Sequence, residues 1–599
     1  MLVLRILAIS TLLLMAATPS RSAAAEFRVG AVGDAACTHT SLLAALFAAV
    51  LNGAGLDTIK IANNQTYTGV NLAVSGHSVR FEGGYATCAS ATPSGRTILS
   101  GSTGLSTAIS TSGSGGHVLE LVNIEIANSP SGGSASRLGG GLRVTGDYEV
   151  VLRNTRIRNN VAARGGGIYV YADLGTRLIL DTPLNAIFAN VASISGGGLY
   201  CDGPAQIELR GGAAAVYQNS AQNNGTDPDE GGTGGGITLL DGCSLLQSGG
   251  GAASGVYDNV AVQYGGGYYL RNLARLRLIG TAQGPARVID NRVSLVTGGT
   301  PGAGGGIAIR DPAGASSFFS EALAENAWID GNYAWQGSGV ALLGGGRFFM
   351  RRTLNGAACH DARYCSSLSF NGMDGSTIGA RAGALWAGYD ATVEITGTYI
   401  EGNSATVGSA FWTNGTARTT LDSVVLSGNF GATTLIDARD LTGPGALILA
   451  WSTVTGNSFT GANGRIISAN QSSANTLQVY GSLLGEPLLT GVLASQLRSD
   501  CVLRDPAMQP VGSGGTVTRQ GTLAAPYGLT APASGNFHLA NGNVVPVDWC
   551  DASLAPRLRT DIAGSTQVID AVRANLHGIH DLGAHEFPDN DRIFANGFQ

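Results

Sequence analysis

The residues with the clearest chemical potential form an acidic cluster, Asp227-Pro228-Asp229-Glu230, in a stretch rich in Gly and Thr. Clustered carboxylates with nearby arginines are the groups that bind Ca²⁺ or move protons in enzymes that cleave polysaccharides. The cluster lacks the spacing of a calcium-binding loop. A solvated loop is therefore the competing interpretation, and the sequence assigns no catalytic residue and no metal.

A second candidate is aromatic. When the chain is aligned on its glycine runs, Tyr169, Tyr200, Tyr269, Trp386 and Trp412 occupy the same outward position of five strands. Flat rings along an exposed sheet can stack on sugars or contact another protein. The competing interpretation is a ladder in which the rings shield one face of a sheet from water. We expect a non-catalytic surface for a glycan or surface-protein ligand, with these five residues as candidate contacts and no cofactor.

Both features depend on a repeat that would hold the residues in columns. A polar residue, usually Asn, precedes a short gap, a run of glycine and an apolar–x–apolar strand. In the clearest copy, Asn160 precedes Gly165-Gly166-Gly167, and alternation places Ile168 and Val170 inside with Tyr169 outside. Glycine runs begin at residues 139, 165, 196, 234, 265 and 304, a period of 26–39 residues. Strand-like content at such a period predicts a solenoid.

The matching asparagines indicate how the coils would stack. They are Asn160, Asn190, Asn219, Asn259, Asn291, Asn332, Asn371, Asn403, Asn429 and Asn457. An Asn amide can bond to the same amide one coil away, and Asn tolerates the left-handed backbone of a tight corner. Glycine, 90 of 599 residues, supplies positive φ at such corners and disfavours helices. These observations predict a parallel β-helix.

Three irregular steps interrupt the repeat. The gap from Asn to the glycine run is 5 or 6 residues in regular coils but 15, 13 and 11 residues after Asn219, Asn291 and Asn371. The sequence therefore predicts three insertions at one corner. Repeat proteins often carry such insertions on a functional face, although tolerated surface loops would give the same pattern.

The N-terminus has the pattern of a secretory signal in residues 1–25. A positively charged start is followed by the apolar stretch Ile6–Ala17 and by Ala23-Ala24-Ala25, an A-x-A cleavage site. No later stretch reaches the roughly 20 apolar residues of a membrane span. The formal net charge of -6 argues against a nucleic-acid partner. We expect a secreted or cell-surface protein.

Eight cysteines in an exported chain predict disulfides. Proximity along the chain suggests the pairs Cys37–Cys88, Cys201–Cys243, Cys359–Cys365 and Cys501–Cys550. Sequence alone does not fix the connectivity. The Cys201–Cys243 pair has the weakest basis, because the two residues stand at different offsets from their glycine runs.

The chain divides into five expected parts. Residues 1–25 are the signal peptide, and residues 26–100 are an N-terminal cap with a short helix in Thr38–Leu51 and the first coils. Residues 101–480 are the β-helix, and residues 481–586 are weaker coils and a C-terminal cap. Residues 587–599 are a C-terminal tail that we interpret as a sorting or anchoring tag. A frayed terminus is the alternative for the tail.

Two stretches resemble known families. The glycine-run and Asn-x-Ala repeat, over roughly residues 120–460, is similar to the passenger region of polymorphic outer-membrane proteins and related right-handed β-helix surface proteins; Gly402-Asn403-Ser404-Ala405 matches it well. Residues 559–586, ending in Asp581-Leu582-Gly583-Ala584-His585-Glu586, resemble the end of bacterial choice-of-anchor Q proteins, with His585 where an aromatic is usual. These resemblances imply a right-handed β-helix and attachment to the outer membrane or cell surface.

The sequence thus predicts an all-β, right-handed parallel β-helix with a helical N-terminal cap and an adhesion or binding role. The alternative is a polysaccharide-degrading lyase or glycoside hydrolase on a pectate-lyase-like β-helix, using Asp227, Asp229, Glu230 and nearby arginines. Three carboxylates converging with an arginine would favour the enzyme. A surface of Ser, Thr and aromatic residues would favour binding.

Overall fold

The computed structural model describes most of the chain between residues 24 and 584. The described ranges are 24–53, 55–101, 107–129, 137–172, 175–182, 185–210, 214–222, 230–294, 301–312, 319–353, 366–372, 380–461, 464–470, 476–486, 489–490, 497–505, 516–517, 520–523, 528–534, 536–539, 549–550 and 581–584. The expected signal peptide up to residue 23, Asp227, Asp229, Cys359, Cys365 and the tail therefore lie outside the described residues.

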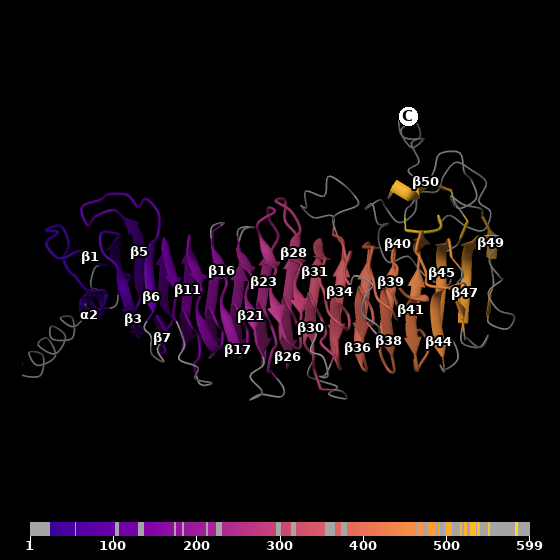
Figure 1. Ribbon diagram of the computed structural model, residues 1–599, viewed down its shortest axis with the longest axis horizontal. Helices are drawn as coiled ribbons and strands as arrows, with labels where there is room; N and C mark the ends of the chain where they lie inside the picture. Colours follow the sequence, from indigo (N-terminus) through magenta and orange to yellow (C-terminus); the bar gives the residue numbers. More distant parts are fainter. Residues whose placement is uncertain are drawn as a thin grey trace, which may run out of the picture.

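The chain forms a right-handed parallel β-helix, which confirms the predicted fold class (Figure 1). The coils stack into an elongated body, with the N-terminal helix at the indigo end and the last coils at the orange and yellow end. Strands of successive coils pair in parallel, so residues one coil apart lie side by side in fixed register.

The sheet that follows the glycine runs is called here the glycine-run sheet. Its 14 strands are β4 (Leu72–Ser75), β7 (Ile109–Ser112), β10 (Leu142–Thr145), β14 (Ile168–Tyr171), β18 (Leu199–Asp202), β22 (Ile237–Leu240), β26 (Tyr268–Arg271), β30 (Ile307–Ile309), β33 (Val340–Leu342), β35 (Leu385–Ala387), β38 (Phe411–Asn414), β41 (Thr434–Arg439), β44 (Arg465–Asn470) and β46 (Leu489–Thr490).

The second sheet follows around the next corner and has 21 strands. They are β1 (Glu26–Val29), β2 (Asp57–Ala62), β5 (Val79–Tyr85), β8 (His117–Val122), β11 (Tyr148–Arg153), β15 (Arg177–Leu180), β19 (Gln206–Leu209), β23 (Ser244–Ser248), β27 (Arg275–Ile279), β31 (Glu321–Glu325), β34 (Gly346–Arg351), β36 (Ala391–Thr396), β37 (Tyr399–Glu401), β39 (Arg418–Asp422), β40 (Val425–Ser427), β42 (Leu447–Ala450), β43 (Thr453–Thr455), β45 (Leu477–Leu484), β47 (Leu497–Arg504), β48 (Thr516–Val517) and β49 (Gln520–Thr522).

The third sheet and a small corner sheet complete each coil of the first half. The nine strands of the third sheet are β3 (Tyr67–Val70), β6 (Thr97–Gly101), β9 (Ile124–Ala127), β12 (Arg156–Arg158), β16 (Ala186–Phe188), β20 (Ala215–Tyr217), β24 (Gly255–Tyr257), β28 (Ala286–Ile289) and β32 (Ala327–Asp330). The corner sheet has β13 (Val161–Arg164), β17 (Val191–Ser195), β21 (Ser220–Ala221), β25 (Val260–Ala261) and β29 (Arg292–Val293).

The interior is a single apolar column that runs from Val29 to Val502. Alternate residues of each strand point into it, and Ile168 and Val170 are fully buried, as the repeat predicts. Each coil buries its apolar side chains against the coils on either side. The stack is therefore stabilised by contacts between neighbours.

All ten predicted asparagines form one ladder at the corner before the glycine runs. In a typical step, Asn190 Nδ2 donates to Asn219 Oδ1 at 3.0 Å, and the backbone N–H of Asn190 donates to the same oxygen at 3.1 Å. Asn190 Nδ2 also donates to Ile157 O at 2.9 Å. The ladder begins where Ser129 N donates to Asn160 Oδ1 and ends where Asn457 N donates to Glu486 Oε1 at 3.0 Å. The predicted amide ladder is confirmed.

The left-handed residue at this corner is the one before each ladder asparagine. Gln218, Asp258 and Asp290 have φ of 54°, 54° and 55°. The expectation that Asn itself adopts this backbone at the ladder positions is therefore wrong. The ladder residue uses its side chain for the stack, and the preceding residue makes the bend.

The glycine runs leave room for the ladder. The first glycine of a run has positive φ, for example 65° at Gly265. A Cβ on the third glycine, Gly236, would lie 3.1 Å from Asn259 Nδ2 and 2.7 Å from Gly267 O. Both distances are too short for a normal Cβ contact. A larger residue at this position would therefore displace the ladder asparagine or the neighbouring backbone.

The N-terminal end is covered by the helix α2 (Leu42–Asn52), within the predicted segment. Leu42, Ala45, Leu46 and Ala49 are buried against the first coils. A disulfide joins Cys37 to Cys88 and ties the segment before the helix to the turn after β5. An amphipathic helix over the first coil removes an exposed sheet edge.

The C-terminal coils have a second apolar cluster outside the main column. It includes Trp451, Trp549 and Leu582, and an antiparallel pair, β50 (Leu529–Ala531) and β51 (Asn536–Leu539), contributes Leu529 and Phe537. Near the end of the chain, Gly583 N donates to Gly481 O at 2.8 Å. Residues 581–584, near the end of the stretch that resembles choice-of-anchor Q proteins, thus dock on the last coils.

Two further disulfides match the expected pairs. Cys201–Cys243 joins successive coils, and Cys501–Cys550 joins β47 to the C-terminal cluster. Three of the four predicted pairs are confirmed, and the fourth lies outside the described residues. Disulfides of this number are typical of proteins outside the reducing cytoplasm. Among the described residues, no helix is long and apolar enough to cross a membrane.

Candidate functional site

The predicted aromatic column exists in the register that the glycine runs indicate. One residue of each successive strand of the glycine-run sheet faces its counterpart in the next strand. The column runs Arg143, Tyr169, Tyr200, Thr238, Tyr269, Ala308, Ala341, Trp386 and Trp412. None of these side chains belongs to the interior column. The predicted outward direction is confirmed.

The expected exposure of this column is wrong. Tyr169, Tyr200 and Tyr269 are 6%, 2% and 0% exposed, and Trp412 is 5% exposed, whereas Trp386 is partly exposed. Tyr169 and Tyr200 stack with ring centroids 5.3 Å apart and an interplanar angle of 7°. The tyrosines form a covered cluster with Leu240 and Ala308, and Leu138 and Tyr264 pack on it.

Residues at the corners cover the tyrosines. Glu230 returns from the first insertion, accepts a hydrogen bond from Tyr200 Oη at 3.0 Å, and pairs with Arg164 at 3.1 Å. Burial, followed by the charge of Glu230, raises the pKa of the Tyr200 phenol. The tyrosine half of the column is therefore an internal stack whose polar groups bind one another, and Glu230 helps to close it.

Three carboxylates gather beside Arg164 at this point. Asp202 ends β18, Asp241 follows β22 one coil later, and the charges of Asp241 and Glu230 both act on Asp202. Burial, followed by the charge of Asp241, raises the pKa of Asp202 to about 6, and Arg164 acts in the opposite direction. A carboxyl whose pKa is raised toward neutral pH beside other carboxylates is a candidate general acid.

The tryptophan half of the column has unsatisfied polar groups. Trp386 and Trp412 meet edge to face, with ring centroids 4.8 Å apart. Among the described residues, the buried Nε1–H groups of both indoles find no hydrogen-bond acceptor. Oδ1 of Asn414, two residues after Trp412 on β38, is likewise buried without a donor there. These three residues are called here the indole cluster. It contains two buried hydrogen-bond donors and one buried acceptor that have no partner among the described residues.

Charged side chains flank the indole cluster. Arg381, which follows the third insertion, places its guanidinium carbon 5.7 Å from the ring centroid of Trp412. On the next strand, Asp437 lies in register with Trp412 and receives two hydrogen bonds from Arg439, at 2.9 and 2.8 Å. The Asp437–Arg439 pair satisfies its own charges. The ion pair therefore does not supply hydrogen bonds to the indole N–H groups or to Asn414 Oδ1, and a bound ligand could supply them.

The third sheet carries an aromatic stripe that the glycine-run alignment does not reveal. Phe188, Tyr217 and Tyr257 lie on successive coils, are partly exposed, and stack with centroids 4.9 and 5.0 Å apart. Each stands two residues before a ladder asparagine. Alignment on the asparagines instead of the glycines would have found them.

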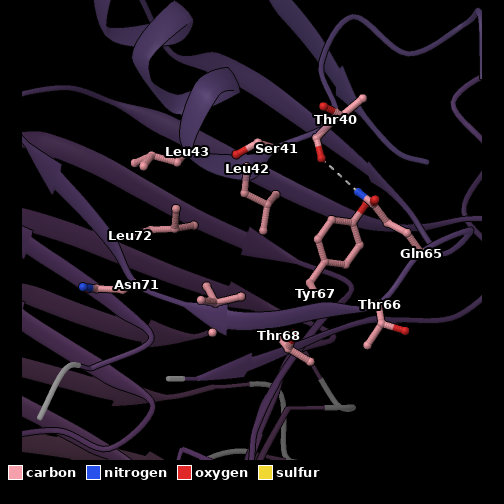
Figure 2. Close-up of a pocket in the computed structure, with 12 residues that line it drawn as sticks. Thr40, Ser41, Leu42, Leu43, Gln65, Thr66, Tyr67, Thr68, Asn71 and Leu72 are labelled. Carbon is pink, nitrogen blue, oxygen red and sulfur yellow. Dashed lines mark hydrogen bonds between the residues drawn. The ribbon is translucent and has the colours of Figure 1, made fainter. Parts of the chain in front are cut away.

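A cavity lined by described residues lies at the N-terminal cap and has a volume of about 280 Å³. Figure 2 shows Tyr67 on one side, with Gln65 Nε2 donating to Thr40 O at 3.4 Å across the cavity. Leu42 and Leu72 contribute apolar surface. Its twelve lining residues include no Asp, Glu, His, Lys or Arg, and Tyr67 is the titratable side chain among them.

One described group of side chains has metal-ligand spacing, Asp34 with Cys37 and Cys88. Its two sulfurs are bonded to each other in the disulfide. A sulfur in a disulfide is not a thiolate ligand, so this group does not fit a metal ion.

Comparison with known proteins adds no family to this description. No protein-family model matches the chain, and no curated protein matches it.

Proposed function

We propose that the protein is an exported, non-catalytic β-helix that binds a hydroxyl-rich glycan through the indole cluster. The observation that carries this proposal is the pair of buried indole N–H groups without acceptors, on Trp386 and Trp412. A buried donor without a partner costs about 1–3 kcal/mol. A ligand that supplies acceptors recovers this cost on binding.

The chemistry of the cluster favours a sugar. A hydroxyl group both accepts and donates hydrogen bonds, so one glycan can serve the two indole donors and the Asn414 oxygen together. Trp386 is partly exposed, and an indole face beside such polar groups suits the apolar face of a sugar ring. A protein ligand is the other partner that the aromatic column would suit.

Export and surface attachment belong to the same proposal. The signal-like residues 1–25, the three disulfides and the resemblance of residues 559–586 to choice-of-anchor Q proteins support it. The repeat resemblance to polymorphic outer-membrane proteins points in the same direction. Cell fractionation of the full chain against a chain ending at residue 586 tests attachment: release of only the shortened chain supports the tail as an anchor.

Glycan-array screening, followed by calorimetric titration of the strongest hit, tests binding. Trp386→Phe and Trp412→Phe keep an aromatic ring and remove the indole donor. Each is expected to weaken binding about tenfold, the equivalent of one hydrogen bond of about 1.4 kcal/mol. Tyr200→Phe is the matched control, because its hydroxyl is bound by Glu230 and not by the ligand. Unchanged affinity in both tryptophan variants would reject the proposal.

A polysaccharide-cleaving enzyme is the second candidate, favoured by the carboxylates near Arg164. Asp202, with a pKa of about 6, would act as the acid, and Asp241 or Glu230 would be the second carboxyl group of the pair. Of the sequence-based candidates, Glu230 belongs to this group, and Asp227 and Asp229 lie outside the described residues. Release of reducing ends from a polysaccharide panel, abolished by Asp202→Asn and retained by Trp412→Phe, would support the enzyme over the binding protein.

A further inference from the structure

A second face of the solenoid carries two arginines beside partly exposed aromatic rings. On the outer side of the third sheet, one column runs Arg156, Ala186, Ala215, Gly255 and Arg287 in register. The three middle residues are small, so they form a flat floor between two arginines. The column spans four coil steps, about 19 Å at the usual strand spacing.

The arginines at the two ends are not used in ion pairs among the described residues; Glu125, in register with Arg156, is paired with Arg158 instead. Among the residues that the structure describes, neither Arg156 nor Arg287 forms an ion pair, whereas the neighbouring Arg158 donates to Glu125 at 2.7 Å. Arg287 Nε is buried without a partner, and its guanidinium carbon lies 4.9 Å from the ring centroid of Trp328. Gly255 leaves space for this arrangement, because a Cβ there would lie 2.9 Å from Arg287 Cβ.

The positive charge at the Arg156 end is concentrated. Burial, followed by the charge of Arg156, lowers the pKa of the Arg96 guanidinium. Burial raises the pKa of the Tyr217 phenol, and the charge of Arg156 acts in the opposite direction. Glu125 acts on Arg96 in the opposite direction, but it is one carboxylate among Arg96, Arg156 and Arg158. The excess of positive charge at this partly exposed end of the sheet favours binding of an anion.

The opposite edge of the floor has a different character. It carries the stacked rings of Phe188, Tyr217 and Tyr257, and Asp258 stands at the corner after them. One edge therefore has an arginine at each end. The other presents phenol hydroxyls and a carboxylate, with Arg158 in register before Phe188. A ligand that fits both edges has acidic groups along one side and hydroxyl groups along the other.

We propose that this face, from Arg156 to Arg287, binds an extended anionic polysaccharide. Sugars bearing carboxylate or sulfate groups place anions toward the arginines and hydroxyls toward the tyrosines and Asp258. The rings repeat every 4.9–5.0 Å, close to the length of one sugar unit in an extended chain. An acidic peptide advances only about 3.3 Å per residue when extended and would bring like charge against Asp258.

The test is binding of four polymers to the full chain: alginate, dextran sulfate, neutral dextran and poly-glutamate. Alginate or dextran sulfate is expected to bind and to weaken with salt, because exposed ion pairs are screened. Binding by alginate alone identifies carboxylate sugars, and binding by dextran sulfate alone identifies sulfated sugars. Equal binding of poly-glutamate, or binding by neither charged polysaccharide, would overturn the proposal.

The paired variant Arg156→Gln/Arg287→Gln is expected to lose at least tenfold in affinity for the anionic polysaccharide. Arg275→Gln/Arg277→Gln removes the same charge from exposed positions on the second sheet and is expected to leave affinity unchanged. Equal loss in both variants would show nonspecific attraction and reject the site. Trp386→Phe/Trp412→Phe should retain this binding, so the result is independent of the proposed glycan site.

Discussion

The ladder predicts that removing one internal asparagine destabilises the solenoid far more than removing an exposed amide. In Asn259→Ala, Asn219 N and Asn219 Nδ2 lose the oxygen to which both donate at 3.0 Å. The Asn259 amide itself no longer donates to Asn291 Oδ1 or to Val216 O, both at 2.9 Å. The affected atoms are buried, so water cannot easily replace these bonds.

The magnitude follows from the number of unsatisfied groups. Two donor hydrogens on Asn219 lose their acceptor, at roughly 1–3 kcal/mol each, which gives a loss of about 2–5 kcal/mol in the free energy of unfolding. Asn219 Nδ2 keeps its bond to Ile187 O at 2.9 Å, so the residue is not wholly stranded. The expected loss in the free energy of unfolding is therefore smaller than the full cost of leaving two donors without any partner.

Urea denaturation followed by circular dichroism measures this change, with hydrogen exchange locating it among the coils. Gln206→Ala is the control, because Gln206 is an exposed amide on β19. The control should lie within about 0.5 kcal/mol of the wild type. If Asn259→Ala also lies within that range, the ladder does not stabilise the coils as argued.

Three other perturbations have defined outcomes. Gly236→Ala should cost about 1–3 kcal/mol in urea denaturation through overpacking, while Gly251→Ala, with open space at its Cβ, should be near neutral. Burial raises the pKa of the Glu486 carboxyl from 4.5 to about 7. Protonation of Glu486 therefore contributes fully to the free energy of unfolding below pH 4.5, and this contribution is lost as pH rises through 7. Stability of the last coils, followed by hydrogen exchange, should fall by at most about 3 kcal/mol over that window, and Glu486→Gln should remove the dependence. Replacing Cys37 and Cys88 by Ser opens a crosslink of sequence separation 51 and should cost roughly 4 kcal/mol, seen as earlier proteolysis of the N-terminal cap.

The sequence was sufficient for features that repeat along the chain. The ten asparagines and the outward column are set by a period and an alternation, and both are read from the spacing of Asn and Gly. The helix at the N-terminus was also predictable, because Thr38–Leu51 is an apolar run next to coils whose edge must be covered.

Coverage of a sheet face was not predictable in the same way. Alternation assigns Tyr200 to the outer side of its strand, but the residue that covers it, Glu230, returns from an insertion 30 residues later. The gathering of Asp202 with Asp241 likewise joins two coils whose separation includes that insertion. The stripe at Phe188 was missed for a simpler reason, because the coils were aligned on glycine and not on the ladder.

The proposed function is tested most directly by the indole N–H signals of the protein labelled with ¹⁵N-tryptophan. The chain has six tryptophans, and the signals of Trp386 and Trp412 are assigned from their Phe variants. On titration with the strongest glycan-array hit, these two signals are predicted to shift together and to saturate, as each N–H gains an acceptor. A saturating ligand that leaves both signals unchanged would contradict the account.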